Sequence, residues 1–221
     1  MNRPKKNSDA NKLRYMGSAV DLPGCPVGDS PEIGIVGRSN AGKSTLINGI
    51  AGTRIAMTSS TPGKTRMLNF YSAPRYRIVD MPGYGFAARS GQEQNSWQDM
   101  IEPYLGARQN LVGLIIVMDI RREWSTDEAN LLKWISPRDL PSVIVLTKAD
   151  KLSRGESINR SKKIQRDSGA EHVLITSSLQ KVGFKELEDL VFDKWIKPID
   201  NAPASEGEDS AGDGSASEDA T

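Results

Sequence analysis

The segment GRSNAGKST at residues 37–45 constrains the fold more than any other part of the chain. It contains the spacing Gly37-x-x-x-x-Gly42-Lys43-Ser44, in which backbone N–H groups face phosphates, the lysine reaches the outer phosphates and the serine binds magnesium. The apolar run 33–36 precedes it and a helical pattern, residues 44–50, follows it. The alternative is a glycine-rich turn without a ligand, which does not need this strand–loop–helix context. The segment therefore predicts a phosphate-binding loop.

Apolar segments of strand length alternate with helical patterns along the chain. Strands are expected at residues 33–36, 67–71, 76–80, 111–118, 142–146 and 172–175, and helices at residues 44–50, 126–135, 157–167 and 184–196. The short turn between the second and third strands makes them antiparallel neighbours. The sequence predicts an α/β fold of three layers, with a mostly parallel six-stranded sheet, one antiparallel strand and helices on both faces.

The composition of the 221 residues excludes several classes of protein. No apolar run reaches the roughly 18 residues of a membrane-spanning helix. One cysteine, Cys25, and one histidine, His172, exclude an internal disulfide framework and a Cys/His metal cluster. The basic start of the chain lacks the apolar core of a secretory signal, so a cytoplasmic location is expected.

Charge is distributed unevenly along the chain. Seven of the 28 acidic residues lie in residues 200–221, which contain no Lys or Arg, so the remainder carries 29 basic and 21 acidic residues. Such a body can attract a polyanion such as RNA, and the alternative is an ordinary solvated surface. The end of the chain is too polar to bury a core. We expect a polar basic arm at residues 1–30, a folded domain at 31–198 and a disordered acidic tail at 199–221.

Four further motifs indicate which nucleotide the loop would bind. Asp80-Met81-Pro82-Gly83 follows a strand, where the aspartate can hold magnesium through water and the glycine N–H can face a γ-phosphate. Thr65, in the polar segment Gly63-Lys64-Thr65-Arg66, can add a hydroxyl ligand to the metal. The carboxylate of Thr147-Lys148-Ala149-Asp150 can accept two hydrogen bonds from guanine that adenine cannot supply. Thr176-Ser177-Ser178 can close over the base.

Together these motifs resemble those of Era-like GTPases. The runs GRSNAGKST, TPGKTR, LNFY, DMPGYGFA and TKAD are similar to the EngB (YihA/YsxC) family of bacterial ribosome-assembly GTPases, over residues 30–197. The resemblance implies a P-loop GTPase fold, with GTP or GDP as ligand and Mg²⁺ as cofactor. The arm and the tail lie outside it.

The motifs and the resemblance together give a set of expected site residues. Catalysis is assigned to Lys43, Asn40, Thr65 and Gly83, and magnesium to Ser44, Thr65 and Asp80. The nucleotide-binding residues are Gly37, Arg38, Ser39, Asn40, Ala41, Gly42, Lys43, Ser44, Gly63, Lys64, Thr65, Arg66, Met67, Asp80, Met81, Pro82, Gly83, Thr147, Lys148, Ala149, Asp150, Thr176, Ser177 and Ser178.

Three positions raise separate questions. Thr147 replaces the asparagine usual in GTPases, although the EngB family tends to have threonine there, and we expect one tether of the loop to be weaker. Tyr84 follows Gly83 where Ras-like proteins have a water-orienting glutamine; it either packs under the next helix or contacts the nucleotide. Asn40 either seats a potassium ion, as in related GTPases, or braces the loop through backbone hydrogen bonds.

The resemblance implies a slowly hydrolysing GTP switch in assembly of the large ribosomal subunit, with a linked role in cell division and septation. The expected partner is the large subunit or its rRNA, with no membrane or DNA partner, and the protein is expected to be a monomer. One alternative is a Ras-like switch that acts on a protein effector at the membrane or division site. Another is an RNA-binding module that the nucleotide merely stabilises.

Overall fold

The computed structural model describes residues 13–57, 67–84 and 101–201. In this part of the chain, seven strands form one sheet in the order β1-β3-β4-β2-β5-β6-β7. The strands are β1 (Arg14–Ala19), β2 (Glu32–Gly37), β3 (Leu68–Ser72), β4 (Arg77–Asp80), β5 (Leu111–Asp119), β6 (Ser142–Thr147) and β7 (Val173–Ile175). The α-helices are α1 (Lys43–Ala51), α3 (Thr126–Ile135), α4 (Arg154–Ser168), α5 (Phe184–Val191) and α6 (Lys197–Asp200).

Shorter helical turns complete the described elements. Residues 101–107 are helical. Two 3₁₀ turns, η2 (Ser136–Arg138) and η3 (Ala149–Lys151), follow α3 and β6, and a π-helical turn, η4 (Phe192–Ile196), joins α5 to α6. None of the helices in the described ranges is long and apolar enough to cross a membrane.

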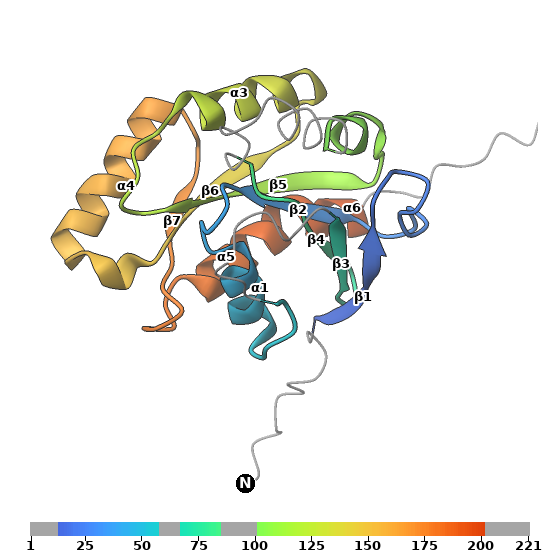
Figure 1. Ribbon diagram of the computed structural model, residues 1–221, viewed down its shortest axis with the longest axis horizontal. Coiled ribbons are helices and arrows are strands. Elements are labelled where there is room, and N and C mark those ends of the chain that lie inside the picture. Colours follow the sequence, from blue (N-terminus) through green and yellow to red (C-terminus); the bar gives the residue numbers. More distant parts are fainter. Residues whose placement is uncertain (1–12, 58–66, 85–100, 202–221) are drawn as a thin grey trace, which may run out of the picture.

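The helices cover the sheet on both faces, as Figure 1 shows, with α3 and α4 on one side and α1, α5 and α6 on the other. Each face has its own buried apolar cluster. One contains Tyr104, Leu131 and Ile164 from the helices above the sheet. The other contains Leu46 of α1, Leu187 of α5 and Trp195 of the π turn. Two clusters separated by a sheet confirm the expected three-layer α/β arrangement.

The directions of the strands agree with the expectation, but their number does not. β2 is parallel to β4 and β5, and β6 is parallel to β5 and β7. β3 is antiparallel to both of its neighbours, β4 and β1, so it is the one strand that opposes the rest. The expected count of six strands is wrong, because β1 adds a seventh.

β1 comes from the stretch that was expected to be a polar arm. It forms because Leu13, just before the strand, and Ala19, at its end, are buried, and because Tyr15 packs edge-on against Tyr71 of β3, with ring centroids 5.7 Å apart. A register shift between Tyr15 and Gly17 interrupts the alternation of buried and exposed residues that would reveal a strand. The division of the chain at residues 30 and 198 stays a prediction.

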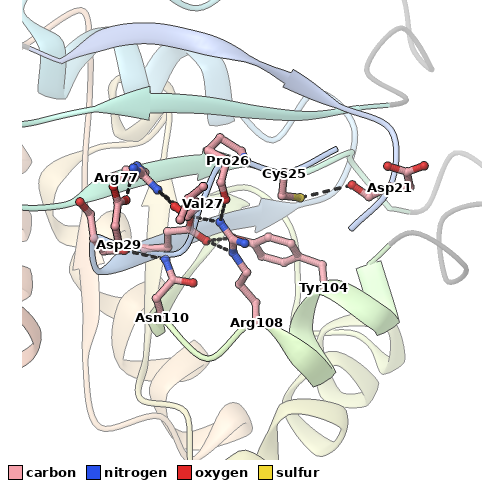
Figure 2. A network of polar contacts seen from close by, with 11 residues as sticks. Asp21, Cys25, Pro26, Val27, Asp29, Arg77, Tyr104, Arg108 and Asn110 are labelled. Atoms are coloured by element: carbon pink, nitrogen blue, oxygen red, sulfur yellow. Dashed lines mark hydrogen bonds and ion pairs between the residues drawn. The ribbon is translucent and has the colours of Figure 1, made fainter. Parts of the chain in front are cut away.

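The segment between β1 and β2 is held by buried charges (Figure 2). Glu32, at the start of β2, is fully buried and accepts hydrogen bonds from Tyr104 at 2.6 Å and from two nitrogens of Arg108 at 2.8 and 2.7 Å. Arg108 also donates to the carbonyl of Pro26, and Arg77 donates to that of Val27. These contacts fix the lead-in to the sheet.

Burial raises the pKa of Glu32, but hydrogen bonds from Arg108 and Tyr104 more than offset this and lower the pKa below its usual value. Because the folded-state pKa is lowered, Glu32 stabilises the fold above its unfolded pKa, and this stability is lost as the pH falls through the folded pKa.

We predict that Arg108→Met lowers the free energy of unfolding at pH 7 by about 3 kcal/mol, the low end for removing one partner of a buried pair, because Tyr104 and Arg77 remain beside Glu32. The deficit should shrink as the pH falls toward 4, where Glu32 can take up a proton. Urea unfolding at several pH values measures this, with Arg166→Met on the exposed face of α4 as the control. Equal stabilities of the two variants at pH 7 would show that the buried pair contributes little.

Candidate nucleotide-binding site

The loop after β2 is shaped by close contacts and left-handed backbone. A Cβ atom on Gly37 would lie 2.3 Å from the carbonyl oxygen of Val117 in β5, so only glycine fits there. Asn40 and Gly42 have φ values of 63° and 104°, which turn the chain back toward α1. α1 begins at Lys43 without a side-chain cap, so its first N–H groups and the loop can face an anion.

Lys43 and Asp80 form the charged centre of the site. Lys43 Nζ lies 3.4 Å from the carbonyl oxygen of Gly37, and Asp80 is the last residue of β4. Burial raises the pKa of Asp80 to about 6, an effect that Lys43 partly offsets. Burial likewise lowers the pKa of Lys43, and Asp80 opposes this shift. The two groups therefore stabilise each other's charged form.

Asp80 has the features of an indirect magnesium ligand. Its Oδ1 is buried and has no hydrogen-bond partner within the described ranges. A buried carboxylate oxygen without a donor is costly unless a ligand or bound water satisfies it. Ser44, the second residue of α1, supplies a hydroxyl next to Lys43 in the sequence. Asp80 and Ser44 could therefore hold a magnesium ion, with the carboxylate acting through water.

The motif after β4 lies on the phosphate loop. A Cβ on Gly83 would be 2.9 Å from the backbone nitrogen of Ser39. The Ser39 N–H donates to the Tyr84 carbonyl at 3.0 Å, and Arg38 and Tyr84 form a parallel bridge. The Tyr84 ring is buried and its hydroxyl donates to Glu128 of α3 at 3.0 Å. These contacts favour the packing interpretation of Tyr84.

The TKAD motif reaches the phosphate loop from the end of β6. The Thr147 hydroxyl contacts the carbonyl oxygens of Ala41 and, at 3.1 Å, Met118. The expected weakening of this tether is therefore offset, because the hydroxyl itself reaches the loop. Lys148 donates to the Asn40 carbonyl at 2.7 Å and lies 3.0 Å from Asp119.

Asp150 is joined to the last motif. Ser177 Oγ donates to Asp150 Oδ1 at 2.8 Å, and the Ala149 N–H donates to the Thr176 carbonyl at 3.2 Å. The hydrogen bond from Ser177 and the nearby Lys151 hold the pKa of Asp150 below its ordinary value. The carboxylate is thus kept charged and oriented. Thr176 and Ser177 are buried, whereas Ser178 is exposed.

Some expected site residues are placed elsewhere or lie outside the described ranges. The described ranges do not include Gly63, Lys64, Thr65 and Arg66. Met67 is exposed just before β3. The Arg38 side chain forms an ion pair with Asp127 of α3, so the residue contributes its backbone to the loop and its charge to the helix.

Two acidic residues at this edge were not singled out from the sequence. Asp119, the last residue of β5, is buried and is bonded to Lys148 and Arg121. Burial alone would raise the pKa of this carboxylate, but Arg121 and Lys148 hold the pKa well below its usual range. Asp119 could have been found from the sequence, because ligands bind at the carboxyl ends of parallel strands. Glu128 forms a capping box with Ser125 at the start of α3, a pattern visible as Ser-x-x-Glu.

A cavity of about 290 Å³ lies beside the loop. Its lining includes Ser39, Asn40, Asp119, Arg122, Glu128 and Lys148. The structure thus brings the ends of β5 and β6, the loop after β2 and the start of α3 together around one space.

Comparisons with known proteins agree with this geometry. The family described as "50S ribosome-binding GTPase" matches residues 32–148. A protein of Bdellovibrio bacteriovorus named "Probable GTP-binding protein EngB" is 48% identical over 186 residues, covering 84% of this chain and 93% of that protein. One of the same name from Haemophilus ducreyi is 36% identical over 206 residues, covering 90% and 97%. The chain belongs to the EngB family of GTP-binding proteins.

Solved structures confirm the P-loop GTPase fold. A crystal structure of a probable GTP-binding protein engB aligns with a TM-score of 0.60 at 22% identity, covering 73% of this EngB-family chain and 97% of that one. Era in complex with MgGDPNP and nucleotides 1506–1542 of 16S ribosomal RNA aligns with a TM-score of 0.62 at 22% identity, covering 75% and 57%. At these identities the likeness concerns the fold alone.

Proposed function

We propose that this EngB-family protein is a GTP switch that hydrolyses GTP slowly and acts in the assembly of the large ribosomal subunit. The observation that carries the proposal is that Asp80 and Thr147 interact with the phosphate loop, at the edge of the sheet where Asp150 follows β6. The matching family of 50S ribosome-binding GTPases supports the choice of partner.

We assign the residue roles within this proposal as the sequence motifs imply. N–H groups of residues 37–44 and the Lys43 ammonium bind the phosphates, except the N–H groups of Ser39 and Ala41, which donate to the Tyr84 and Arg38 carbonyls. Ser44, Thr65 and Asp80 would hold Mg²⁺, which would neutralise phosphate charge when bound. Asp150 accepts two hydrogen bonds from guanine, Lys148 lies along the base, and Thr176, Ser177 and Ser178 close over it. In the switch, the Gly83 N–H contacts the γ-phosphate, and the Thr65 hydroxyl binds the metal only when this phosphate is present.

Slow hydrolysis follows from Tyr84. It occupies the place where Ras-like proteins use a glutamine to orient water, and its hydroxyl is already bonded to Glu128. We therefore expect slow intrinsic turnover, on the order of the 10⁻⁴ s⁻¹ that Ras shows without its activator.

The base contact gives a prediction about specificity. Asp150→Asn replaces an acceptor by an amide that can also donate, so it should weaken GTP binding and favour xanthosine triphosphate, whose 2-oxo group needs a donor. Competition binding with GTP and xanthosine triphosphate measures the change. Asp167→Asn, near the end of α4, is the control, since it changes the same chemical group outside the expected site residues. Unchanged GTP affinity of Asp150→Asn would remove the base-reading role.

Asn40 gives a second prediction, which concerns potassium. Its left-handed backbone and its place on the cavity support both a cation site and a loop brace. A potassium ion there would stabilise charge that develops between the phosphates. Hydrolysis should then be faster in potassium than in sodium at equal ionic strength, and Asn40→Ala should remove the difference. Equal rates in the two salts would leave Asn40 as a brace.

Co-sedimentation with large ribosomal subunits tests the proposed partner. Binding should be stronger with a non-hydrolysable GTP analogue than with GDP, and should weaken as salt rises, because rRNA phosphates neutralised by basic residues release counterions. The small subunit is the matched control. Equal binding in both nucleotide states, or binding that salt does not change, contradicts the proposal.

The proposal has three further parts: location, oligomeric state and cellular role. We place the protein in the cytoplasm as a monomer, without a membrane or DNA partner, and a role in division and septation follows from the supply of ribosomes. Stable association with membranes and not with subunits would favour the Ras-like alternative. Subunit binding that is independent of the nucleotide state would favour the RNA-binding module.

A further inference from the structure

Tyr84 and Glu128 form a buried contact between the segment after β4 and the first turn of α3. The Tyr84 hydroxyl donates to Glu128 Oε1 at 3.0 Å. Glu128 Oε2 accepts from the Ser125 N–H at 3.2 Å and from the Ser125 hydroxyl. Both carboxylate oxygens are therefore engaged, and Tyr84 and Glu128 are only 8% and 2% exposed. The carboxylate is fixed by the helix, so it offers the phenol a rigid acceptor.

The backbone of the same segment contacts the phosphate loop. The Tyr84 carbonyl accepts the Ser39 N–H at 3.0 Å, and Gly83 lies so close to Ser39 that a Cβ would be 2.9 Å from its nitrogen. The position of Gly83 is thus fixed on one side by the loop and, through the next residue, by α3. The ion pair between Arg38 and Asp127 joins the loop to the same turn of α3.

We propose that Tyr84 is a positioning residue that holds Gly83 ready for the γ-phosphate through its hydrogen bond to Glu128, and thereby sets the preference for GTP over GDP. This inference rests on the proposed function, because it assigns the γ-phosphate contact to the Gly83 N–H. The start of α3 becomes the element that responds to the nucleotide state.

The preference for GTP over GDP follows from the contact between the γ-phosphate and the Gly83 N–H. A ligand shifts a conformational equilibrium only through contacts that differ between the two states. GDP has no γ-phosphate, so its affinity does not depend on where Gly83 lies. GTP loses affinity when Gly83 must be ordered at the moment of binding. Loss of the tether therefore weakens GTP and leaves GDP unchanged.

Tyr104 offers a matched control. Its hydroxyl also donates to a buried carboxylate, Glu32, at 2.6 Å, and its ring lies in the same apolar cluster as Tyr84. Glu32 begins β2, whereas the phosphate loop follows the other end of this strand. Tyr104→Phe removes the same kind of hydrogen bond without touching the site, so it reports the effect of general destabilisation.

The experiment measures dissociation constants for GDP and a non-hydrolysable GTP analogue on the full chain with Mg²⁺, together with the melting temperature. Tyr84→Phe should weaken the analogue about tenfold, the size of one hydrogen bond to a charged group, and change GDP less than about twofold. Tyr104→Phe should lower the melting temperature and leave the affinity ratio unchanged. Glu128→Gln should largely retain the ratio, because a phenol can donate to or accept from the amide.

Each outcome separates the two proposals. If the parent protein binds neither nucleotide, the proposed function and this inference both fail. If the parent binds both and Tyr84→Phe keeps the parent ratio, or weakens both nucleotides equally, only the positioning role fails. A ratio that also changes in Tyr104→Phe would assign the effect to general loss of stability and would overturn the inference.

Discussion

The site depends on the close approach of Gly37 to β5. A side chain at Gly37 would collide with the Val117 carbonyl. Because glycine has none, β2 and β5 can stay paired up to the point where the phosphate loop begins. Parallel strands bring the residues that follow each of them to one edge of the sheet. Asp80, Asp119 and Thr147 end β4, β5 and β6, and each is directed by that geometry toward the loop or its partners.

Two buried carboxylates at opposite ends of the sheet, Glu32 and Asp80, differ in their hydrogen bonds. Glu32 at the start of β2 is satisfied by Tyr104 and Arg108, and its pKa is lowered. Asp80 at the end of β4 has an oxygen with no partner in the described structure, and its pKa is raised to about 6. An unsatisfied buried acceptor costs about 1–3 kcal/mol. The unsatisfied oxygen of Asp80 thus lies at the edge where a ligand can supply the partner, whereas Glu32 is satisfied at the opposite edge.

Local patterns predicted the strand ends and the layers, but long-range contacts could not be read from them. The expected strand at residues 142–146 is β6 with one further residue, and the antiparallel pair β3–β4 followed from its short turn. β1 was missed, because its pairing depends on β3, which lies about fifty residues further along the chain. The Thr147 tether was underestimated for a similar reason, since the hydroxyl reaches Ala41 at a separation of 106 residues.

The contacts of the loop bear on nucleotide binding more directly than on hydrolysis. Thr147 and Lys148 hold the loop from β6, and Tyr84 and Arg38 join it to α3. A loop fixed by such contacts needs little ordering when phosphates arrive, and this favours affinity. The phenol of Tyr84 has one O–H donor, and Glu128 accepts it. The Tyr84 hydroxyl is therefore engaged by α3. Under the proposed function, a cation or a partner group brought to the loop would have to stabilise the charge that develops during hydrolysis.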